Sequence, residues 1–328
     1  MAEDLVSVVI PVRDEAPFIE ATVNSILAQD YAGPLEIIIA DGMSDDGTRD
    51  ILDGLSARHD NLRYVDSPTG RTPNGLNLAI HASHGDVIVR CDGHAELPPD
   101  YVSTAVAVME ETGAVNVGGI QHAVGETWMQ RAIAIAMTSR IGVGDARFHF
   151  GGEAGPVDTV YLGVFRREPL FEAGLFDEDL TRNQDYELNI RLRNNGGTVW
   201  FDPRLHVVYR PRRTLGGLAR QYYQYGQWKH RVIRMHPQST RLRQLAPPIF
   251  VLALLASLVM AFTPWRGTAV VVPALYLVAL IVATTAQLLR TRDWAALGLP
   301  LAVATMHASW GIGFLASAPS SVVNQRAN

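Results

Sequence analysis

The residues best suited to chemistry lie where short apolar runs end. The run at residues 87–89 (VIV) is followed within a few positions by Asp92, Gly93 and His94. A buried strand that delivers an acid, a glycine and a histidine at its carboxyl end is typical of a ligand site. The alternative is a turn in which His94 only forms a hydrogen bond or touches a phosphate.

Two further acidic loops lie at similar places. Residues 11–15 (PVRDE) come at the end of the apolar run at 6–12, and residues 40–48 (ADGMSDDGT) follow the run at 35–40. The carboxylates and backbone of the second loop could hydrogen-bond a nucleobase or a ribose. An ordinary turn, in which Asp and Ser cap the next helix, would have the same composition.

The elements that must position these loops alternate between strand and helix. The apolar runs predict strands at 6–12, 35–40, 61–65, 86–90, 199–202 and 206–209, and periodic segments predict helices at 18–29, 48–59, 72–83, 126–140 and 183–195. Asn183 is the expected N-cap of the last helix. Continuous apolar strands that alternate with helices predict an α/β fold, a mostly parallel sheet with helices on both faces. Ligands of such sheets bind beyond the carboxyl ends of the strands, where all three acidic loops lie.

The order of these motifs resembles the family 2 glycosyltransferases, inverting enzymes with the Rossmann-like GT-A fold. The segments VSVVIPVRDEAPFIEATVNSIL, IIIADGMSDDGT and GLNLAIHASHGDVIVRCDGH carry the resemblance, which covers about residues 5–210. The family's usual second motif is Val-Asp-Asp-Gly-Ser-Thr-Asp-Gly-Thr, and Gly42 and Met43 depart from it. The resemblance implies donor-binding roles for Pro11, Val12, Arg13, Glu15, Asp41, Asp46, Arg71, Asp92 and Gly93. Asp41 would contact the uracil of UDP, and Arg71 would touch the diphosphate or else lie on the surface.

The family's metal motif, Asp-x-Asp, falls on Asp92-Gly93-His94, where the first acid matches and the second does not. The resemblance implies a divalent ion, Mn²⁺ or Mg²⁺, that neutralises charge on the departing diphosphate. Because Mg²⁺ prefers oxygen ligands and imidazole suits Mn²⁺ better, His94 as a ligand would favour Mn²⁺. Glu96 is a further candidate ligand.

The family's late acidic pair, often Glu-Asp, falls on Gln184-Asp185. The resemblance implies that Asp185 takes the proton of the acceptor hydroxyl while the oxygen attacks the anomeric carbon from behind. The alternative is that Asp185 only caps a helix.

Charge and hydropathy divide the chain. Residues 1–202 carry 14 bases and 32 acids, whereas residues 203–328 carry 14 bases and one acid. The second part contains three stretches without acid or base, roughly 246–264, 268–289 and 295–317. Each is near the ~20 residues that cross a bilayer. These stretches predict three transmembrane helices rather than the core of a soluble domain.

The arginines predict the orientation of these spans. Several precede the first span and two lie between the second and third, whereas the intervening loop has only Arg266. The positive-inside rule then places the catalytic part in the cytoplasm and the C-terminus outside, in a multi-pass protein of the inner or plasma membrane. The lone Cys91 and the lack of an N-terminal apolar segment agree with a cytoplasmic catalytic part.

We therefore expect four parts: a GT-A catalytic domain (1–210), a basic amphipathic juxtamembrane segment (211–245), three membrane helices (246–317) and a tail (318–328). Residues 203–243 hold ten Lys and Arg and no acid, which favours contact with anionic headgroups or with a diphosphate. The candidate acceptor or phosphate contacts are Gln184, Arg210, Arg212, Trp228 and Lys229.

These features predict an inverting transferase that moves one hexose, expected from UDP-glucose, to a polyprenyl-diphosphate-linked saccharide. Within the family the chain resembles bacterial exopolysaccharide glucosyltransferases of the succinoglycan type, which share the Asp-x-His-Ala departure and the Asp-Tyr-Glu-Leu block. The alternatives are a processive polysaccharide synthase, disfavoured because Gln-x-x-Arg-Trp is absent, and a non-catalytic nucleotide-sugar-binding scaffold. A homo-oligomer or a synthesis complex is a further expectation. The acidic catalytic part disfavours nucleic acid.

Overall fold

The computed structural model describes residues 4–317, and of Arg243 the backbone alone. The expected tail at 318–328 lies outside these residues. The chain divides into two compact units, Met1–His122 with Phe150–Tyr209, and Ala123–His149 with Arg210–Asn328. The first unit thus ends within one residue of the expected boundary at 210, but segment Ala123–His149 clusters with the C-terminal part. The four-part division stays a prediction.

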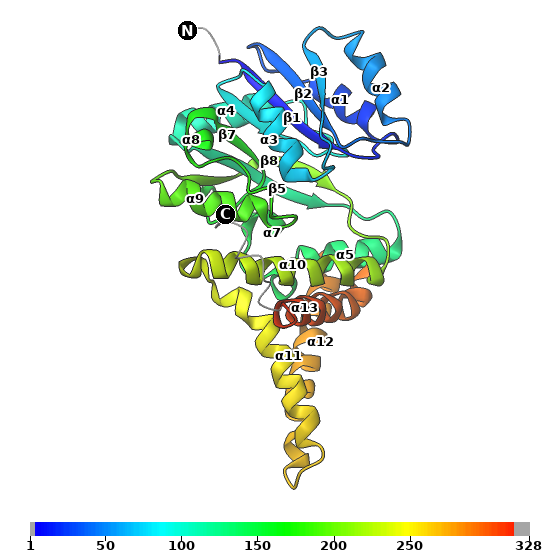
Figure 1. The fold of residues 1–328 in the computed structure, drawn as a ribbon. Helices are drawn as coiled ribbons and strands as arrows, with labels where there is room; N and C mark the ends of the chain where they lie inside the picture. Colours follow the sequence, from blue (N-terminus) through cyan, green and yellow to red (C-terminus); the bar gives the residue numbers. More distant parts are fainter. Residues whose placement is uncertain (1–3, 318–328) are drawn as a thin grey trace. The chain divides into compact units, whose positions relative to one another are not determined.

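The first unit is built on one mixed sheet (Figure 1). Its strand order is β3 (Leu62–Asp66), β2 (Leu35–Asp41), β1 (Val6–Val12), β4 (Val87–Arg90), β7 (Tyr161–Arg166), β5 (Asn116–Ala123), β8 (Val199–Tyr209) and β6 (Gly155–Pro156). The strands from β3 to β4 are parallel, whereas β7 pairs antiparallel with both β4 and β5. The sheet is therefore parallel in the half that carries the three acidic loops.

Helices cover both faces of this sheet, as the unbroken apolar runs of its parallel strands require. The helices are α1 (Ile19–Leu27), α2 (Thr48–Ser56), α3 (Thr72–Ala82), α4 (Tyr101–Thr112), α8 (Arg167–Glu172) and α9 (Gln184–Asn194). Val8 belongs to a core shared with α1, α2 and α4. The next residue, Val9, belongs to a second core shared with α3, α8 and α9. Strands buried on both faces leave only their ends for polar side chains.

The structure differs from the predicted elements at two places. The two strands expected at 199–202 and 206–209 are one strand, β8, because residues between them stay extended. Asn183 occupies the N-cap position of α9, but its backbone is left-handed (φ 60°) and its side chain makes no capping hydrogen bond.

The second unit is helical. It contains α5 (Trp128–Met137), α6 (Arg140–Val143), α10 (Leu215–Met235), α11 (Leu242–Met260), α12 (Val271–Thr291), the 3₁₀ helix η3 (Trp294–Gly298) and α13 (Leu299–Leu315). Two helical segments, Arg266–Thr291 and Trp294–Leu315, are long and apolar enough to cross a membrane, and Gln244–Met260 is apolar but shorter. The prediction of three crossings is therefore neither confirmed nor excluded.

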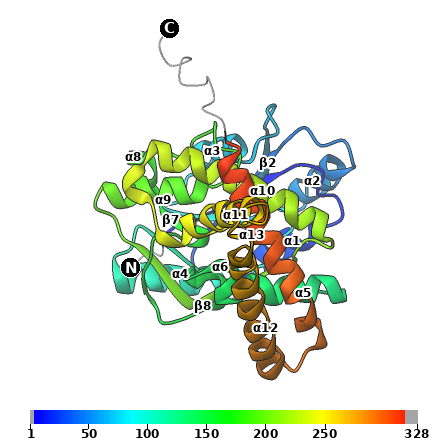
Figure 2. The same cartoon turned by 90° about the horizontal axis from the view of Figure 1, so that it is seen from below.

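The apolar helices of this unit differ in their surroundings. Within the most apolar stretch of each span, only 6% is buried in Arg266–Thr291, compared with 44% in Trp294–Leu315. In Figure 1, α11 and α12 extend away from α10, whereas α13 lies against α10 and α5 (Figures 1 and 2). The close approach requires glycine, since a Cβ on Gly226 would lie 2.1 Å from the carbonyl oxygen of Trp310. The side chains of α12 thus need an apolar solvent much more than those of α13 do.

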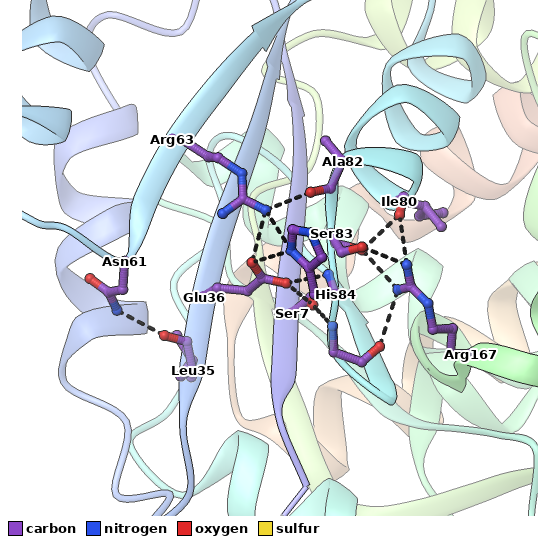
Figure 3. A network of polar contacts seen from close by, with 11 residues as sticks. Ser7, Leu35, Glu36, Asn61, Arg63, Ile80, Ala82, Ser83, His84 and Arg167 are labelled. Atoms are coloured by element: carbon purple, nitrogen blue, oxygen red, sulfur yellow. Dashed lines mark hydrogen bonds and ion pairs between the residues drawn. The ribbon is translucent and has the colours of Figure 1, made fainter.

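A polar network ties the amino ends of the parallel strands together, at the edge opposite to the acidic loops (Figure 3). The carboxylate of Glu36 on β2 accepts hydrogen bonds from the Ser7 hydroxyl (2.6 Å) and the His84 backbone N–H (2.5 Å), and its other oxygen lies 2.9 Å from Arg63. Burial raises the pKa of Glu36, but these hydrogen bonds and the Arg63 guanidinium outweigh burial and lower the pKa from 4.5 to about 2.

Replacing Glu36 with glutamine is expected to lower the free energy of unfolding by about 2 kcal/mol at pH 7, because hydrogen bonds to a charged group are lost. The pKa of Glu36 is lower in the folded state than in the unfolded state. The stabilisation by Glu36 is therefore present above pH 4.5 and disappears as the pH falls toward 2. Denaturant unfolding of the detergent-solubilised chain at pH 7, 5 and 3 measures the difference. The matched control is Glu20→Gln, since the carboxylate of Glu20 forms an exposed 3.5 Å pair with Arg58. A stability difference that does not shrink on acidification would contradict this assignment.

Candidate functional site

A cavity of about 220 Å³ opens in the first unit at the carboxyl ends of β1, β2 and β4. Its lining includes nine residues that the sequence pointed to, namely Pro11, Val12, Arg13, Glu15, Arg71, Asp92, Gly93, His94 and Gln184. It also includes eight others, namely Ala40, Gly42, Ser67, Gly70, Thr72, Gly75, Arg90 and Arg182. The parallel strands bring these residues together, because Val12 pairs with Asp41 across β1 and β2 and Val9 pairs with Arg90 across β1 and β4.

Asp41 does not line this cavity. Its side chain is fully buried, accepts a hydrogen bond from the Ser44 hydroxyl (2.6 Å) and lies 3.4 Å from the Arg49 guanidinium. Gly42 lines the cavity in its place, and a Cβ there would lie 3.0 Å from the Val12 carbonyl oxygen. A side chain at position 42 would therefore crowd the backbone of Val12 and Gly70, which agrees with a glycine here in place of the family's acid. The contact of Asp41 with a nucleobase stays a prediction.

Asp46 holds two loops together. Its carboxylate accepts hydrogen bonds from the Thr48 hydroxyl (2.5 Å) and from the backbone N–H groups of Thr48 and Ala16 (both 3.0 Å). These hydrogen bonds, that of the Thr48 hydroxyl first, lower the pKa of Asp46. The Thr48 hydroxyl in turn accepts from the Glu15 backbone N–H (2.9 Å). These contacts form a turn ahead of α2, whose N-cap position is Gly47 and has no side-chain capping hydrogen bond. A direct contact of Asp46 with the donor stays a prediction.

Guanidinium groups dominate the charge of the lining. Arg13, Arg71, Arg90 and Arg182 line the cavity beside only two acids, Glu15 and Asp92. Arg13 lies over Gly70, where the backbone is left-handed (φ +59°) and a Cβ would lie 2.5 Å from the Arg13 guanidinium. A surface of this kind suits a diphosphate, whose oxygens match the arginine fork.

The expected base and the expected metal ligand meet at one residue that the sequence argument missed. Arg90, the last residue of β4, donates through Nη2 to Asp92 Oδ1 (3.0 Å) and through Nη1 to Asp185 Oδ1. Burial opposes the charge of Arg90, but the carboxylates of Asp185 and Asp92 raise its pKa well above the ordinary value. A charged residue closing the apolar run VIVR was the available signal.

Glu15 pairs with His94. The distance from Glu15 Oε1 to His94 Nδ1 is 2.9 Å, and the His94 side chain is about half exposed, at 54%. Metal-ligating imidazoles commonly have a carboxylate on their other nitrogen, which orients the ring. The neighbouring Gly93 is tightly packed, since a Cβ there would lie 2.8 Å from Val12 Cγ1. Glu96, the other candidate ligand, is exposed and does not line the cavity.

These side chains would suit a divalent ion only if substrate phosphates or waters supplied most of its ligands. Within residues 4–317 no group of three or more His, Cys, Asp or Glu forms a complete metal site. Mg²⁺ and similar ions usually take one or two carboxylates, with substrate phosphates and waters completing the shell. Asp92, whose side chain is 25% exposed at the cavity, can supply that carboxylate, and His94 stays a candidate beside it.

The remaining candidates lie in the second unit. Arg210 pairs with Glu126 (3.3 Å), Arg212 donates to Gln221 (3.3 Å), the Arg231 guanidinium lies 5.3 Å from the Trp228 ring, and Lys229 is buried. Their contact with an acceptor stays a prediction.

Comparison with known proteins finds similarity to proteins of glycan synthesis. The family model described as Glycosyl transferase family 2 matches residues 7–172. The succinoglycan biosynthesis protein ExoA of Rhizobium meliloti (strain 1021) is 29% identical over 317 residues, 94% of this chain and 93% of that protein. A dolichyl N-acetyl-alpha-D-glucosaminyl phosphate 3-beta-D-2,3-diacetamido-2,3-dideoxy-beta-D-glucuronosyltransferase of Methanococcus voltae is 25% identical over 320 residues, 95% of this chain and 96% of that protein.

A mannosyltransferase of known structure resembles nearly the whole chain. The mannosyltransferase PcManGT from Pyrobaculum calidifontis, in complex with GDP-Man and Mn²⁺, has a TM-score of 0.65 at 19% identity and covers 96% of this chain and 88% of its own. This likeness concerns the fold.

Proposed function

The chain belongs to glycosyl transferase family 2, and from this premise we propose that it moves a single hexose from a UDP-sugar to a lipid-diphosphate-linked glycan. The observation that carries this proposal is the arginine-lined cavity in which one guanidinium holds Asp92 and Asp185. Synthesis of an exopolysaccharide or cell-envelope glycan is the proposed context. The similarity to a succinoglycan biosynthesis protein supports it, as does a relative whose name describes a dolichyl-phosphate-linked sugar.

In this proposal, Arg13, Arg71 and Arg182 of the cavity bind the donor diphosphate, and Asp92 would hold a metal ion beside it. The bound ion would be Mn²⁺ or Mg²⁺, and it would neutralise the charge that develops on the leaving group. Asp185 accepts the proton of the acceptor hydroxyl. The oxygen then attacks the anomeric carbon from the face opposite the diphosphate, so that the anomeric configuration inverts as the bond to the diphosphate breaks.

A thermal-shift screen with UDP-, GDP- and dTDP-sugars, each with and without Mn²⁺, tests the donor. We expect UDP-sugars with Mn²⁺ to raise the melting temperature most, because a ligand that binds only the folded state stabilises it. A shift confined to GDP- or dTDP-sugars would overturn the choice of nucleotide. The length of the product tests the proposal of single transfer. A ladder of long polymer would show processive synthesis instead.

We further propose that α11 and α12 anchor the chain in the membrane with the catalytic unit in the cytoplasm. The large apolar side chains of α12 are mostly exposed, for example Leu275 (66%) and Leu289 (75%). Hydropathy predicted three crossings, but we propose that only α11 and α12 cross. α13 packs on α10 and α5 instead. Both of those helices carry arginines that favour the interface over the bilayer core. Alkaline phosphatase fused to the C-terminus would then lie in the cytoplasm and be inactive. An active fusion would instead support the third crossing.

A further inference from the structure

Arg90 is placed unusually for a charged side chain. It ends the central strand β4, between β1 and β7, and its side chain is only 7% exposed. Taking a guanidinium out of water is costly unless carboxylates compensate for it. Here two carboxylates do so, and the Nε atom has no hydrogen-bond partner in the described part of the chain. The hydrogen bonds that the Arg90 guanidinium donates therefore go to Asp92 and Asp185.

The two acids reach Arg90 from separate elements. Asp92 lies in the turn after β4, closed by the hydrogen bond from Ala95 N–H to the Asp92 carbonyl oxygen (3.0 Å). Asp185 lies in the first turn of α9. The guanidinium of Arg90 is shared by both carboxylates and so links the two segments. An arginine can provide this link because its donors form a planar, rigid fork, whereas a lysine is a point charge on a flexible stem.

We propose that Arg90 is a positioning residue that holds Asp185 in register with Asp92, and thereby sets the acceptor oxygen in line with the leaving diphosphate. This inference rests on the proposed function, in which Asp92 binds the metal-diphosphate and Asp185 the acceptor hydroxyl. Arg90 also offsets part of the negative charge of the acid pair before the metal ion arrives. Its role differs from that of Arg71 and Arg13, which also line the cavity, Arg13 with Asp14 3.7 Å away.

The first experiment measures Mn²⁺ binding to the full chain in detergent, by EPR of free Mn²⁺ without donor. Arg90→Gln removes a positive charge 3.0 Å from the Asp92 carboxylate, so Mn²⁺ should bind about threefold tighter or more. At the same time, the turnover of sugar transfer should fall about 100-fold, because small misplacements of reacting groups cost this much. The donor KM should change by less than about threefold. Metal affinity and turnover thus move in opposite directions, which a merely unfolded variant cannot show.

The second experiment asks whether Arg90 acts through Asp185. If it does, Arg90→Gln should lower turnover by less than about threefold in a chain that already carries Asp185→Asn, because residues that act as a unit are not additive. Arg90→Lys keeps the charge and should recover part of the loss. The matched control is Arg204→Gln, since Arg204 also bridges two carboxylates, Asp202 (3.0 Å) and Glu111 (2.9 Å), but does not line the cavity.

Three outcomes would overturn the inference: weaker Mn²⁺ binding to Arg90→Gln, a full loss that persists in the Asp185→Asn chain, or a large rise in donor KM. The last two would make Arg90 a direct diphosphate ligand. Folding is checked independently, because Cys91 is the single cysteine, is fully buried beside Arg90 and should stay unreactive to a thiol reagent in folded variants. If the wild type transferred no sugar from any donor, the proposed function would fail, while the Mn²⁺ titration would still decide the coupling of Arg90 to Asp92.

Discussion

Replacing Asp185 with asparagine is expected to lower the turnover of sugar transfer by about 10³-fold, within the range that general-base catalysis contributes. The amide is nearly the same shape and can still accept a hydrogen bond from Arg90, but it cannot take up the proton of the acceptor hydroxyl. Donor binding should therefore be unchanged, because Asp185 does not line the cavity that would hold the nucleotide. Initial rates at saturating donor, together with the donor-induced thermal shift, measure the two effects separately.

The competing role of Asp185 is to stabilise the start of α9. An acid in a first helical turn favours the helix through the macrodipole, and its loss lowers stability by less than about 1 kcal/mol. Asp50→Asn is the matched control, since Asp50 is an exposed acid in the first turn of α2. If Asp185→Asn kept turnover within about tenfold of the wild type and only lowered the melting temperature as the control does, Asp185 would be a helix-stabilising residue and not the base.

The family and the half of the fold that carries the loops could be predicted from local sequence. The match to Glycosyl transferase family 2 and the likeness to PcManGT confirm the expected family and GT-A fold. The prediction succeeded because the parallel strands are buried on both faces and therefore read as unbroken apolar runs. For example, β1 and β4 were expected at 6–12 and 86–90 and lie at Val6–Val12 and Val87–Arg90.

The antiparallel half could not be predicted in the same way. β5 carries Gly118 and Gly119, where a Cβ would clash with Tyr161 and Leu205 from other strands. These glycines break the apolar pattern of a strand. The close approach of neighbouring strands that requires them is seen only once the strands are paired. β6 is only two residues long, too short for any periodic signal.

The site was predicted at the level of its loops but not of its ion pairs. Residue type and strand-end position indicated Asp92, whereas Asp185 was indicated only by the position of the family's late acidic pair. The burial of Asp41 against Arg49, by contrast, depends on a contact that no local pattern encodes. The same holds for Arg90, which in sequence is only a charged residue at the end of an apolar run, and which becomes informative once α9 brings Asp185 to it.

Replacing Asp92 with asparagine is expected to abolish most metal-dependent transfer, with a loss of about 100-fold or more in kcat/KM, because the ion that neutralises the leaving diphosphate loses its carboxylate ligand. Only Asp92 and Glu15 supply carboxylates to the cavity lining, and Glu15 is engaged with His94. Mn²⁺ titration should show weaker binding, and the Mn²⁺-dependent part of the donor-induced thermal shift should disappear.

Two comparisons separate the ligand role of Asp92 from a general loss of charge. Glu96→Gln removes a nearby acid that does not line the cavity, so its transfer rate should stay within about twofold of the wild type. His94→Ala should weaken the binding of Mn²⁺ more than that of Mg²⁺, because an imidazole ligand favours the softer ion and Mg²⁺ prefers oxygen ligands. Equal losses in Asp92→Asn and Glu96→Gln would place the ion elsewhere. Transfer that continues unchanged in a chelator would remove the metal from the reaction and leave Arg13, Arg71 and Arg182 of the cavity to neutralise the diphosphate.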